Sequence, residues 1–186
     1  MPDTASAMNF CTNCGAPVAL SVPQGDHLPR HVCTACHAIH YSNPKVVVGC
    51  VPEWEGRILL CRRAIEPRRG FWTMPAGFME NGESTRAGAA RETFEESQAR
   101  VQVEELVTVI SIPDINQVHL LFRARMETAH HGPTPESSEV ALFHEADIPW
   151  EALAFRSVQH TLRHYVEDRR LGRRDPHLID LGPRMV

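Results

Sequence analysis

The sequence predicts an α/β protein that begins with a small, separately stabilised segment. Four of its six cysteines lie close together near the start of the chain, in a stretch too short to build its own apolar core. Beyond them, β-branched runs typical of buried strands lie on both sides of a stretch with helical spacing. With 186 residues, 42% of them hydrophobic, the chain can form one full core in addition to the small segment.

The clustered cysteines lie in two C-x2-C pairs within residues 1–43. The first pair is Cys11 and Cys14, and the second is Cys33 and Cys36. Four thiolates arranged in this way close a tetrahedral Zn²⁺ site with no open position, so the spacing predicts a structural zinc ribbon. Disulfides and a four-sulfur iron site are the alternatives. Neighbouring histidines can substitute as ligands, but we expect them to be ordinary surface residues.

The charge distribution gives the chain no general affinity for nucleic acid. Its formal net charge is −4, and Arg30 is the only Lys or Arg in residues 1–43, so the ribbon lacks a basic surface for phosphates. No apolar run approaches the roughly 20 residues of a membrane-spanning helix, and the first residues do not resemble a signal peptide. We therefore expect a cytoplasmic protein without nucleic-acid or membrane partners, in which the ribbon is structural or forms a dimer.

Residues 44–63 predict a β-hairpin. A β-branched run at 45–51 lies between two prolines, and residues 57–63 return the chain after a Trp-Glu-Gly turn. Arg62 and Arg63 face opposite sides of the second strand. One of them can therefore reach a substrate phosphate, and the alternative is a solvated arginine at the end of a strand.

The most informative stretch is residues 77–99. If residues 91–96 are helical, Glu92, Glu95 and Glu96 project from one face, with no Lys or Arg between them. Each like-charged pair at this spacing costs the helix roughly 0.2–0.5 kcal/mol, which a bound cation would offset. Such carboxylates are the ligands that Mg²⁺ takes while it keeps positions for water and substrate phosphates. Three glutamates alone would favour the simpler interpretation of a solvated acidic face.

The wider spacing around these glutamates favours a metal site. A G-x5-E-x7-R-E-U-x-E-E-x-G-U pattern resembles the Nudix box, and the chain matches it at Gly77, Glu83, Arg91, Glu92, Glu95 and Glu96. Thr93 stands where the family usually has an aliphatic residue. Gln98 stands where the family has the glycine that ends the helix. We expect Gln98 either to adopt the left-handed conformation, at a conformational cost of about 1 kcal/mol, or to let the helix continue past this position.

The resemblance implies a Nudix α/β/α sandwich with a mixed sheet, and Mg²⁺ or Mn²⁺ bound against a diphosphate. It also implies that a backbone carbonyl at Ala76 or Gly77 joins the glutamates on the metal, and that Glu83 and Arg91 form a supporting pair. The reaction implied is hydrolysis of a nucleoside diphosphate linked to a group X, giving a nucleoside monophosphate and X-phosphate. The ribbon and the Tyr-Ser-Asn-Pro turn that follows it resemble one branch of the family. We expect this chain to form a homodimer.

Several residues outside the box are further candidates for the site. Trp72 lies in a Gly-x-Trp-x-x-Pro-Ala-Gly approach to the box, and Phe155 and Arg156 are placed to line a nucleotide pocket. Glu136 and Glu139 are candidates for the general base or an additional metal ligand, with Glu139 preferred because it lies beside a predicted strand. An exposed loop carboxylate is the alternative for either residue.

The remaining residues complete the domain assignment. Residues 101–113 and 116–126 predict two more strands, and an apolar stripe after residue 150 predicts a helix that packs on the core. We place the ribbon at 1–43, the Nudix domain at 44–170 and an irregular tail at 171–186. The tail carries two glycines and two prolines and has no periodicity.

The resemblance favours ADP-ribose or FAD as the substrate. The branch that hydrolyses NADH also carries a zinc ribbon, but it has a Ser-Gln-Pro-Trp-Pro-Phe-Pro stretch after the box, and nothing similar follows Ala99. NADH, capped RNA and nucleotide sensing without catalysis remain alternatives. The number of metal ions and the identity of the general base are left open.

Overall fold

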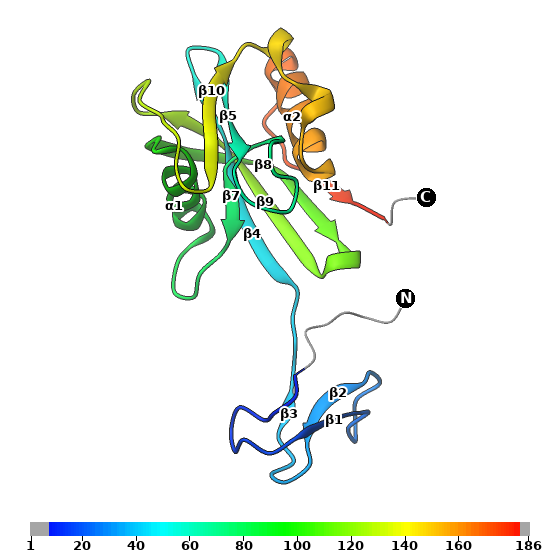
Figure 1. Cartoon of the computed structure of the whole chain (residues 1–186). Coiled ribbons are helices and arrows are strands. Elements are labelled where there is room, and N and C mark those ends of the chain that lie inside the picture. The colour runs from blue at the N-terminus through cyan, green and yellow to red at the C-terminus, as the bar shows by residue number, and fades with distance from the viewer. Residues whose placement is uncertain (1–7, 183–186) are drawn as a thin grey trace. The chain divides into compact units, whose positions relative to one another are not determined.

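The computed structural model describes residues 8–182, and the chain divides into two compact units between Asn43 and Pro44 (Figure 1). The first unit is a three-stranded antiparallel sheet formed by β1 (Val18–Ser21), β2 (Arg30–Cys33) and β3 (Ile39–His40). Among its described residues, only Cys11 and Cys33 are buried. This unit therefore has no apolar core, and its buried centre consists of cysteine.

The second unit is built on one mixed sheet with the strand order β10-β5-β4-β9-β8-β11. Parallel pairs join β4 to β9 and β8 to β11, whereas the other neighbours on this path are antiparallel. Two short strands, β6 and β7, pair with β5 and β4 respectively. The strands are β4 (Lys45–Trp54), β5 (Arg57–Arg63), β6 (Trp72–Thr73), β7 (Ala76–Phe78), β8 (Val101–Ile112), β9 (Gln117–Met126), β10 (Ser137–Phe143) and β11 (His177–Asp180).

Two α-helices cover opposite faces of this sheet, as Figure 1 shows, and three short 3-10 helices lie in its connections. Val48 and Cys50 of β4 pack in one apolar cluster with Ala89 on the first helix, whereas Val51 packs in another cluster with Leu162 on the second. This alternation confirms the predicted α/β/α sandwich. The helices are α1 (Thr85–Ser97), α2 (Arg156–Leu171), η1 (Pro113–Ile115), η2 (Glu145–Asp147) and η3 (Trp150–Ala152).

The start and end of α1 follow from local sequence. Ser84 is the N-cap, and its side chain accepts a hydrogen bond from the backbone N–H of Ala87 at 3.2 Å. Gly88 lets the helix approach β4, because a Cβ there would lie 2.5 Å from a Glu83 oxygen and 2.9 Å from Val48. The helix ends at Gln98, which is left-handed with φ of 59° and whose N–H donates to the carbonyl of Phe94.

The prediction of an irregular tail at 171–186 is wrong for residues 177–180, and Leu171 is the last residue of α2. His177–Asp180 forms β11 in parallel register with β8, and Leu181 is buried in the core behind it. The pairing joins segments far apart in the sequence, which a search for local periodicity cannot detect. The last residues of the predicted tail, 183–186, and residues 1–7 of the predicted ribbon lie outside the described part of the chain. No helix within residues 8–182 is long and apolar enough to span a membrane.

Candidate metal centres and nucleotide site

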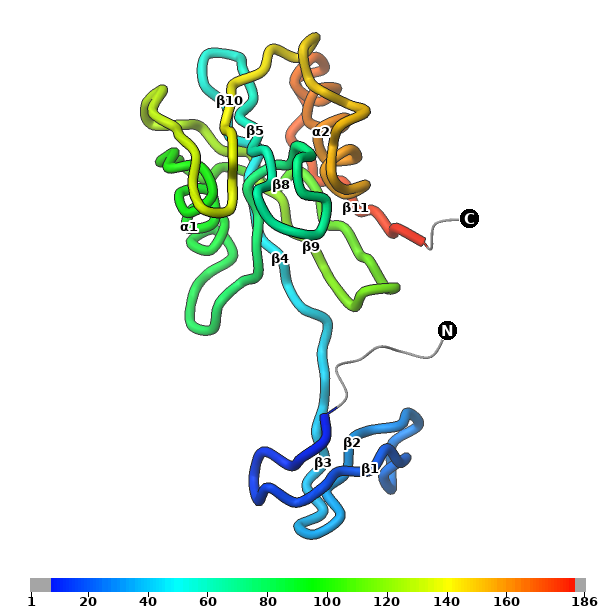
Figure 2. Tube along the Cα trace, in the orientation of Figure 1, coloured from blue at the N-terminus to red at the C-terminus, as the bar shows by residue number. Residues whose placement is uncertain are grey.

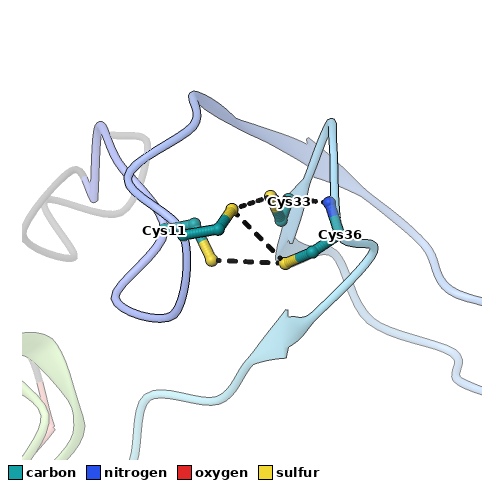
Figure 3. Close-up of side chains that lie close together, drawn as sticks. Cys11, Cys33 and Cys36 are labelled. Atoms are coloured by element: carbon teal, nitrogen blue, oxygen red, sulfur yellow. Dashed lines mark hydrogen bonds between the residues drawn. The ribbon is translucent and has the colours of Figure 1, made fainter.

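The four cysteine sulfurs of the first unit converge on a point. Sγ–Sγ distances are 3.7 Å for Cys11 and Cys36, 3.5 Å for Cys14 and Cys33, and 3.5 Å for Cys14 and Cys36. Figure 3 shows the side chains of Cys11, Cys33 and Cys36 pointing toward one another. A tetrahedron with Zn–S bonds of about 2.3 Å has edges of about 3.8 Å, so these sulfurs fit Zn²⁺ closely.

Backbone amides reinforce the thiolate character of this site. The Sγ of Cys33 accepts hydrogen bonds from the N–H groups of Cys36 and Ala35, at 3.3 and 3.4 Å, and these bonds lower the pKa of Cys33 to about 6. The N–H of Asn13 donates to Cys11 in the same way at 3.4 Å. His40 lies outside the four sulfurs, with Nε2 3.3 Å from the Sγ of Cys11. Its position is that of a partner to a ligand.

The carboxylates of α1 face the backbone of β7. Glu96 is buried, and its Oε2 accepts a hydrogen bond from the N–H of Ala76 at 3.1 Å. Glu92 lies so close to Gly77 that a Cβ on that residue would collide with its carboxylate. The glycine of the box is therefore required by close contact, not by its φ angle.

Arg91 supplies the positive charge that the sequence suggested was lacking on this face. Its guanidinium donates to carboxylate oxygens of Glu83, Glu92 and Glu95, each at 2.8 Å. It also donates to the carbonyl of Phe78 at 3.2 Å, which ties α1 to the end of β7. The hydrogen bonds from Arg91 lower the pKa of Glu83 to about 2. The Arg91 guanidinium thus offsets the negative charge of Glu92 and Glu95 on α1 and of Glu83 in the loop before it.

Burial makes the inner carboxylates difficult to ionise. It raises the pKa of Glu96 to about 7 and also raises the pKa of Glu92, and the nearby Glu136 carboxylate adds to both effects. Desolvated oxygens that repel one another are a donor set suited to a hard divalent cation. Within residues 8–182, only the four cysteines bring three or more ligand atoms within 4.8 Å of one another. The carboxylates are therefore gathered less tightly than the sulfurs.

A cavity of about 430 Å³ lies beside the first residues of β7. Ala76 and Gly77 line it, and so do Arg63, Phe155 and Arg156. The guanidinium of Arg63 lies 5.1 Å above the ring of Phe155, and its charge offsets part of the rise that burial causes in the pKa of Glu96. The volume is within the range of sites for small molecules. A larger cavity, of about 710 Å³, lies at the opposite end of α2 and includes none of the predicted site residues.

Two predicted substrate-binding residues lie elsewhere. Arg62 donates to the carbonyl of Gly70 at 2.9 Å and pairs with Glu139 at 3.3 Å, and it does not line the 430 Å³ cavity among its described residues. Trp72 packs edge-on against Phe143, with ring centroids 4.9 Å apart, and belongs to the apolar core. Both positions are consequences of strand parity and of the β5–β6 pairing, which the sequence alone left open.

Sequence reasoning missed some residues of the cavity and preferred Glu139 over Glu136 among the loop glutamates. Phe78 and His119 line the cavity, and burial lowers the pKa of His119 to about 4. A histidine inside an apolar strand was the available signal for that residue. The Glu136 carboxylate adds to the rise in the pKa of Glu92 and Glu96, and its backbone N–H donates to the Thr134 hydroxyl, which in turn donates to the carbonyl of Glu96. Glu139 instead pairs with Arg62.

Comparison with known proteins identifies the family. Residues 9–42 match the zinc-ribbon family described as Nudix N-terminal, and residues 43–166 match the family described as NUDIX domain. The chain belongs to the Nudix family. A NUDIX hydrolase from Nitrosomonas europaea of known structure is 53% identical, and the match covers 95% of this chain and 100% of that one with a TM-score of 0.92.

Two relatives whose names state a substrate match this chain at lower identity and over only part of their own length. An NAD-capped RNA hydrolase, NudC, from Stutzerimonas stutzeri is 30% identical over 179 residues, which are 93% of this chain and 61% of that protein. An ADP-ribose pyrophosphatase from Methanocaldococcus jannaschii is 36% identical over 74 residues, which are 40% of this chain and 44% of that protein. This Nudix chain therefore spans less than two thirds of the length of either relative.

The two departures from the Nudix box have structural explanations. Thr93 is fully buried, and its hydroxyl donates to the carbonyl of Ala89 at 2.7 Å, so it fills the place of an aliphatic residue without an unpaired polar group. Gln98 does not extend the helix. It adopts the left-handed conformation that glycine favours, at a cost of about 1 kcal/mol.

Proposed function

We propose that this Nudix protein is a divalent-metal-dependent hydrolase that cleaves the diphosphate of ADP-ribose or FAD. The observation that carries the proposal is that the start of β7 contacts both the carboxylates of α1 and the 430 Å³ cavity. Ala76 and Gly77 contact the carboxylates of Glu96 and Glu92, and the same two residues line the 430 Å³ cavity. A diphosphate bound at the carboxylates would thus have its nucleoside beside a cavity of suitable size.

The proposed metal ligands are oxygen donors on α1 and β7. Glu92, Glu95 and Glu96, with a backbone carbonyl of Ala76 or Gly77, would hold Mg²⁺ or Mn²⁺. Crowded and partly desolvated carboxylates suit such a cation. The chemistry that a divalent ion supplies when bound is neutralisation of the diphosphate, polarisation of phosphorus and a lower pKa for water.

The other residues of the site have proposed roles in proton transfer and positioning. Glu136 accepts a proton from the attacking water. The water oxygen forms a bond to one phosphorus, and the bond from that phosphorus to the bridging oxygen of the diphosphate breaks. The products are AMP and either ribose 5-phosphate or FMN. Arg63 and Phe155 would hold the nucleoside part, the first by charge and both by their planar surfaces. Glu83 and Arg91 fix the loop before α1 and need not contact the substrate.

A second candidate is hydrolysis of NAD-capped RNA, which the long match to the Stutzerimonas protein favours. Against it, Arg30 is the only Lys or Arg within residues 1–43, so the ribbon offers little charge to an RNA backbone. Binding to RNA would weaken steeply with salt, whereas hydrolysis of a small nucleotide would change little. The homodimer expected from the ribbon remains a prediction, which sedimentation velocity tests.

The test is hydrolysis of ADP-ribose, FAD, NADH and NAD-capped RNA in parallel, with Mg²⁺ or Mn²⁺, followed by chromatographic separation of products. Glu95→Gln serves as the blank, because it removes one proposed ligand charge from a partly exposed side chain. Glu151→Gln is the matched control, since Glu151 is an exposed glutamate away from the box. We expect AMP with ribose 5-phosphate or FMN, a loss of at least about 100-fold in Glu95→Gln, and no loss in Glu151→Gln.

Each alternative function predicts a different result. Preferred cleavage of NAD-capped RNA, with rates that fall as salt rises, would favour the second candidate over the first. Tight binding of a nucleotide without cleavage would favour a sensing role. Equal rates in the wild type and Glu95→Gln would contradict the assignment of the carboxylates.

A further inference from the structure

A loop of residues 127–136, between β9 and β10, is attached to the end of the helix that carries the proposed metal ligands (Figures 1 and 2). Three hydrogen bonds join them. The N–H of Gly132 donates to the carbonyl of Ser97 at 2.9 Å, and the hydroxyl of Thr134 donates to the carbonyl of Glu96 at 3.4 Å. The side-chain amide of Gln98 donates to the carbonyl of Pro133 at 2.7 Å, the shortest of the three.

Gln98 occupies a backbone conformation in which glutamine is unfavourable. Its φ of 59° is left-handed, and glycine, which the Nudix box has at this position, would adopt it freely. A side chain retained in such a conformation suggests that its contacts have a role. Here the side chain crosses to the loop and lies beside Gly132, where an added Cβ would be 3.4 Å from the amide nitrogen of Gln98.

The attachment at Pro133 extends to Glu136 through Thr134. The Thr134 hydroxyl accepts hydrogen bonds from the N–H groups of Glu136 and Ser137, at 3.3 and 3.2 Å. The carbonyl of Glu136 accepts from the N–H of Ala64, just beyond β5, at 2.7 Å. The backbone of Glu136 is therefore held from two sides, and one of them depends on the contacts at Pro133 and Thr134.

We propose that Gln98 is a positioning residue that holds Glu136 near the Glu96 end of α1 by fixing the loop 127–136 there. The inference rests on the proposed function, in which Glu136 accepts a proton. Its chemical requirement is specific. A side-chain N–H must reach the Pro133 carbonyl, which neither glycine nor glutamate can provide.

The test uses two variants that remove the donor in different ways. Gln98→Gly keeps the left-handed backbone without its unfavourable side chain, and Gln98→Glu keeps the size of the side chain but not the N–H. We expect kcat to fall about tenfold in both, with KM changed less than about twofold, because proton transfer depends on sub-ångström placement. Glu55→Gly is the matched control, since Glu55 also has a positive φ, of 48°, in the β4–β5 turn. Its kcat should not change.

A double-mutant cycle separates positioning from a general loss of structure. If Gln98 acts through Glu136, then Gln98→Gly will lower kcat in the wild type but not further in Glu136→Gln. Hydrogen exchange of the peptide 127–137 should accelerate in Gln98→Gly, with no fall in the melting temperature. Wild-type kcat in both Gln98 variants, or a full further loss in the Glu136→Gln background, would overturn the inference.

The same experiments distinguish this inference from the proposed function. Wild-type kcat in Glu136→Gln would overturn Glu136 as the base and the positioning role with it, while leaving the hydrolase assignment intact. A wild-type protein that cleaves none of the nucleotides would contradict the proposed function. The attachment would then be judged by hydrogen exchange, and unchanged exchange in Gln98→Gly would overturn it.

Discussion

The two candidate metal centres of this chain are built in opposite ways. In the ribbon, four sulfurs converge to 3.5–3.7 Å for the closest pairs, and no described residue except two of the cysteines is buried. On α1, the carboxylates lie on a helix that packs against a large apolar core and is braced by Arg91. In the ribbon, a bound metal would do the work of an apolar core. The helix that carries the carboxylates packs on an apolar core that needs no metal.

The largest expected effect is the loss of the ribbon when its metal is removed. Cys33→Ser, or treatment with a chelator, should unfold the first unit, because structural zinc is worth about 10 kcal/mol in small zinc domains. The second unit should keep its melting transition. Zinc analysis with hydrogen exchange of residues 8–43 and 44–182 measures both parts. A ribbon that stays protected without zinc would break the contrast between the two centres.

The next prediction separates a proposed ligand from its support. Glu96→Gln should lower kcat/KM by at least about 100-fold without lowering the melting temperature, because the buried carboxylate is costly to ionise. Arg91→Ala should lower both, since it leaves Glu83, Glu92 and Glu95 without their shared cation. Steady-state kinetics and thermal melts of the two variants provide the measurement. Full activity in Glu96→Gln would remove it from the ligand set.

A smaller effect tests whether β11 belongs to the core of the second unit. Leu181→Ala should cost about 2–3 kcal/mol of unfolding free energy, because Leu181 is 5% exposed in the main cluster. Leu178→Ala on the same segment should cost less than about 0.5 kcal/mol, because that side chain is 80% exposed. Denaturant titrations compare the pair. Equal costs would mean that the segment does not pack as described.

The smallest predicted effect is a pH dependence from His119. Burial lowers the pKa of His119 from 6.5 to about 4, so between these values the unfolded chain binds a proton that the native protein does not. Native stability should therefore fall as pH falls through this window, by about 1 kcal/mol after allowance for partial exposure. His119→Gln should reduce that fall in urea titrations at pH 4.5 and 7.5. An identical pH dependence in the variant would contradict this origin.

The sequence predicted those features of the fold and the site that depend on residues close together along the chain. The cysteine pairs and the spacing from Gly77 to Glu96 are local, and they led directly to the ribbon and to the helix that carries the carboxylates. Parity alone could not decide between Arg62 and Arg63. In the structure, the pairings of β5 with β6 and β10 place Arg62 opposite Trp72 and Glu139, whereas Arg63 lines the 430 Å³ cavity.

Long-range features were out of reach for the same physical reason. β11 pairs in register with residues 69 positions earlier, as in His177 with Thr108, and its four residues carry no pattern of their own. The preference for Glu139 over Glu136 rested on closeness to a predicted strand. In the structure, the loop of Glu136 is joined to the end of α1 by the contacts of Gln98 with Pro133 and of Thr134 with Glu96, which link segments more than 30 residues apart.

The central claim is that the two centres have separate roles, one structural and one in hydrolysis. The most direct measurement is the rate of ADP-ribose and FAD hydrolysis as Mg²⁺ or Mn²⁺ is titrated, with bound zinc quantified in the same samples of wild type and Glu95→Gln. We expect the wild-type rate to follow the added cation at constant zinc content, and Glu95→Gln to keep its zinc but lose hydrolysis. Hydrolysis that follows zinc content instead, or that persists in Glu95→Gln, would contradict the account.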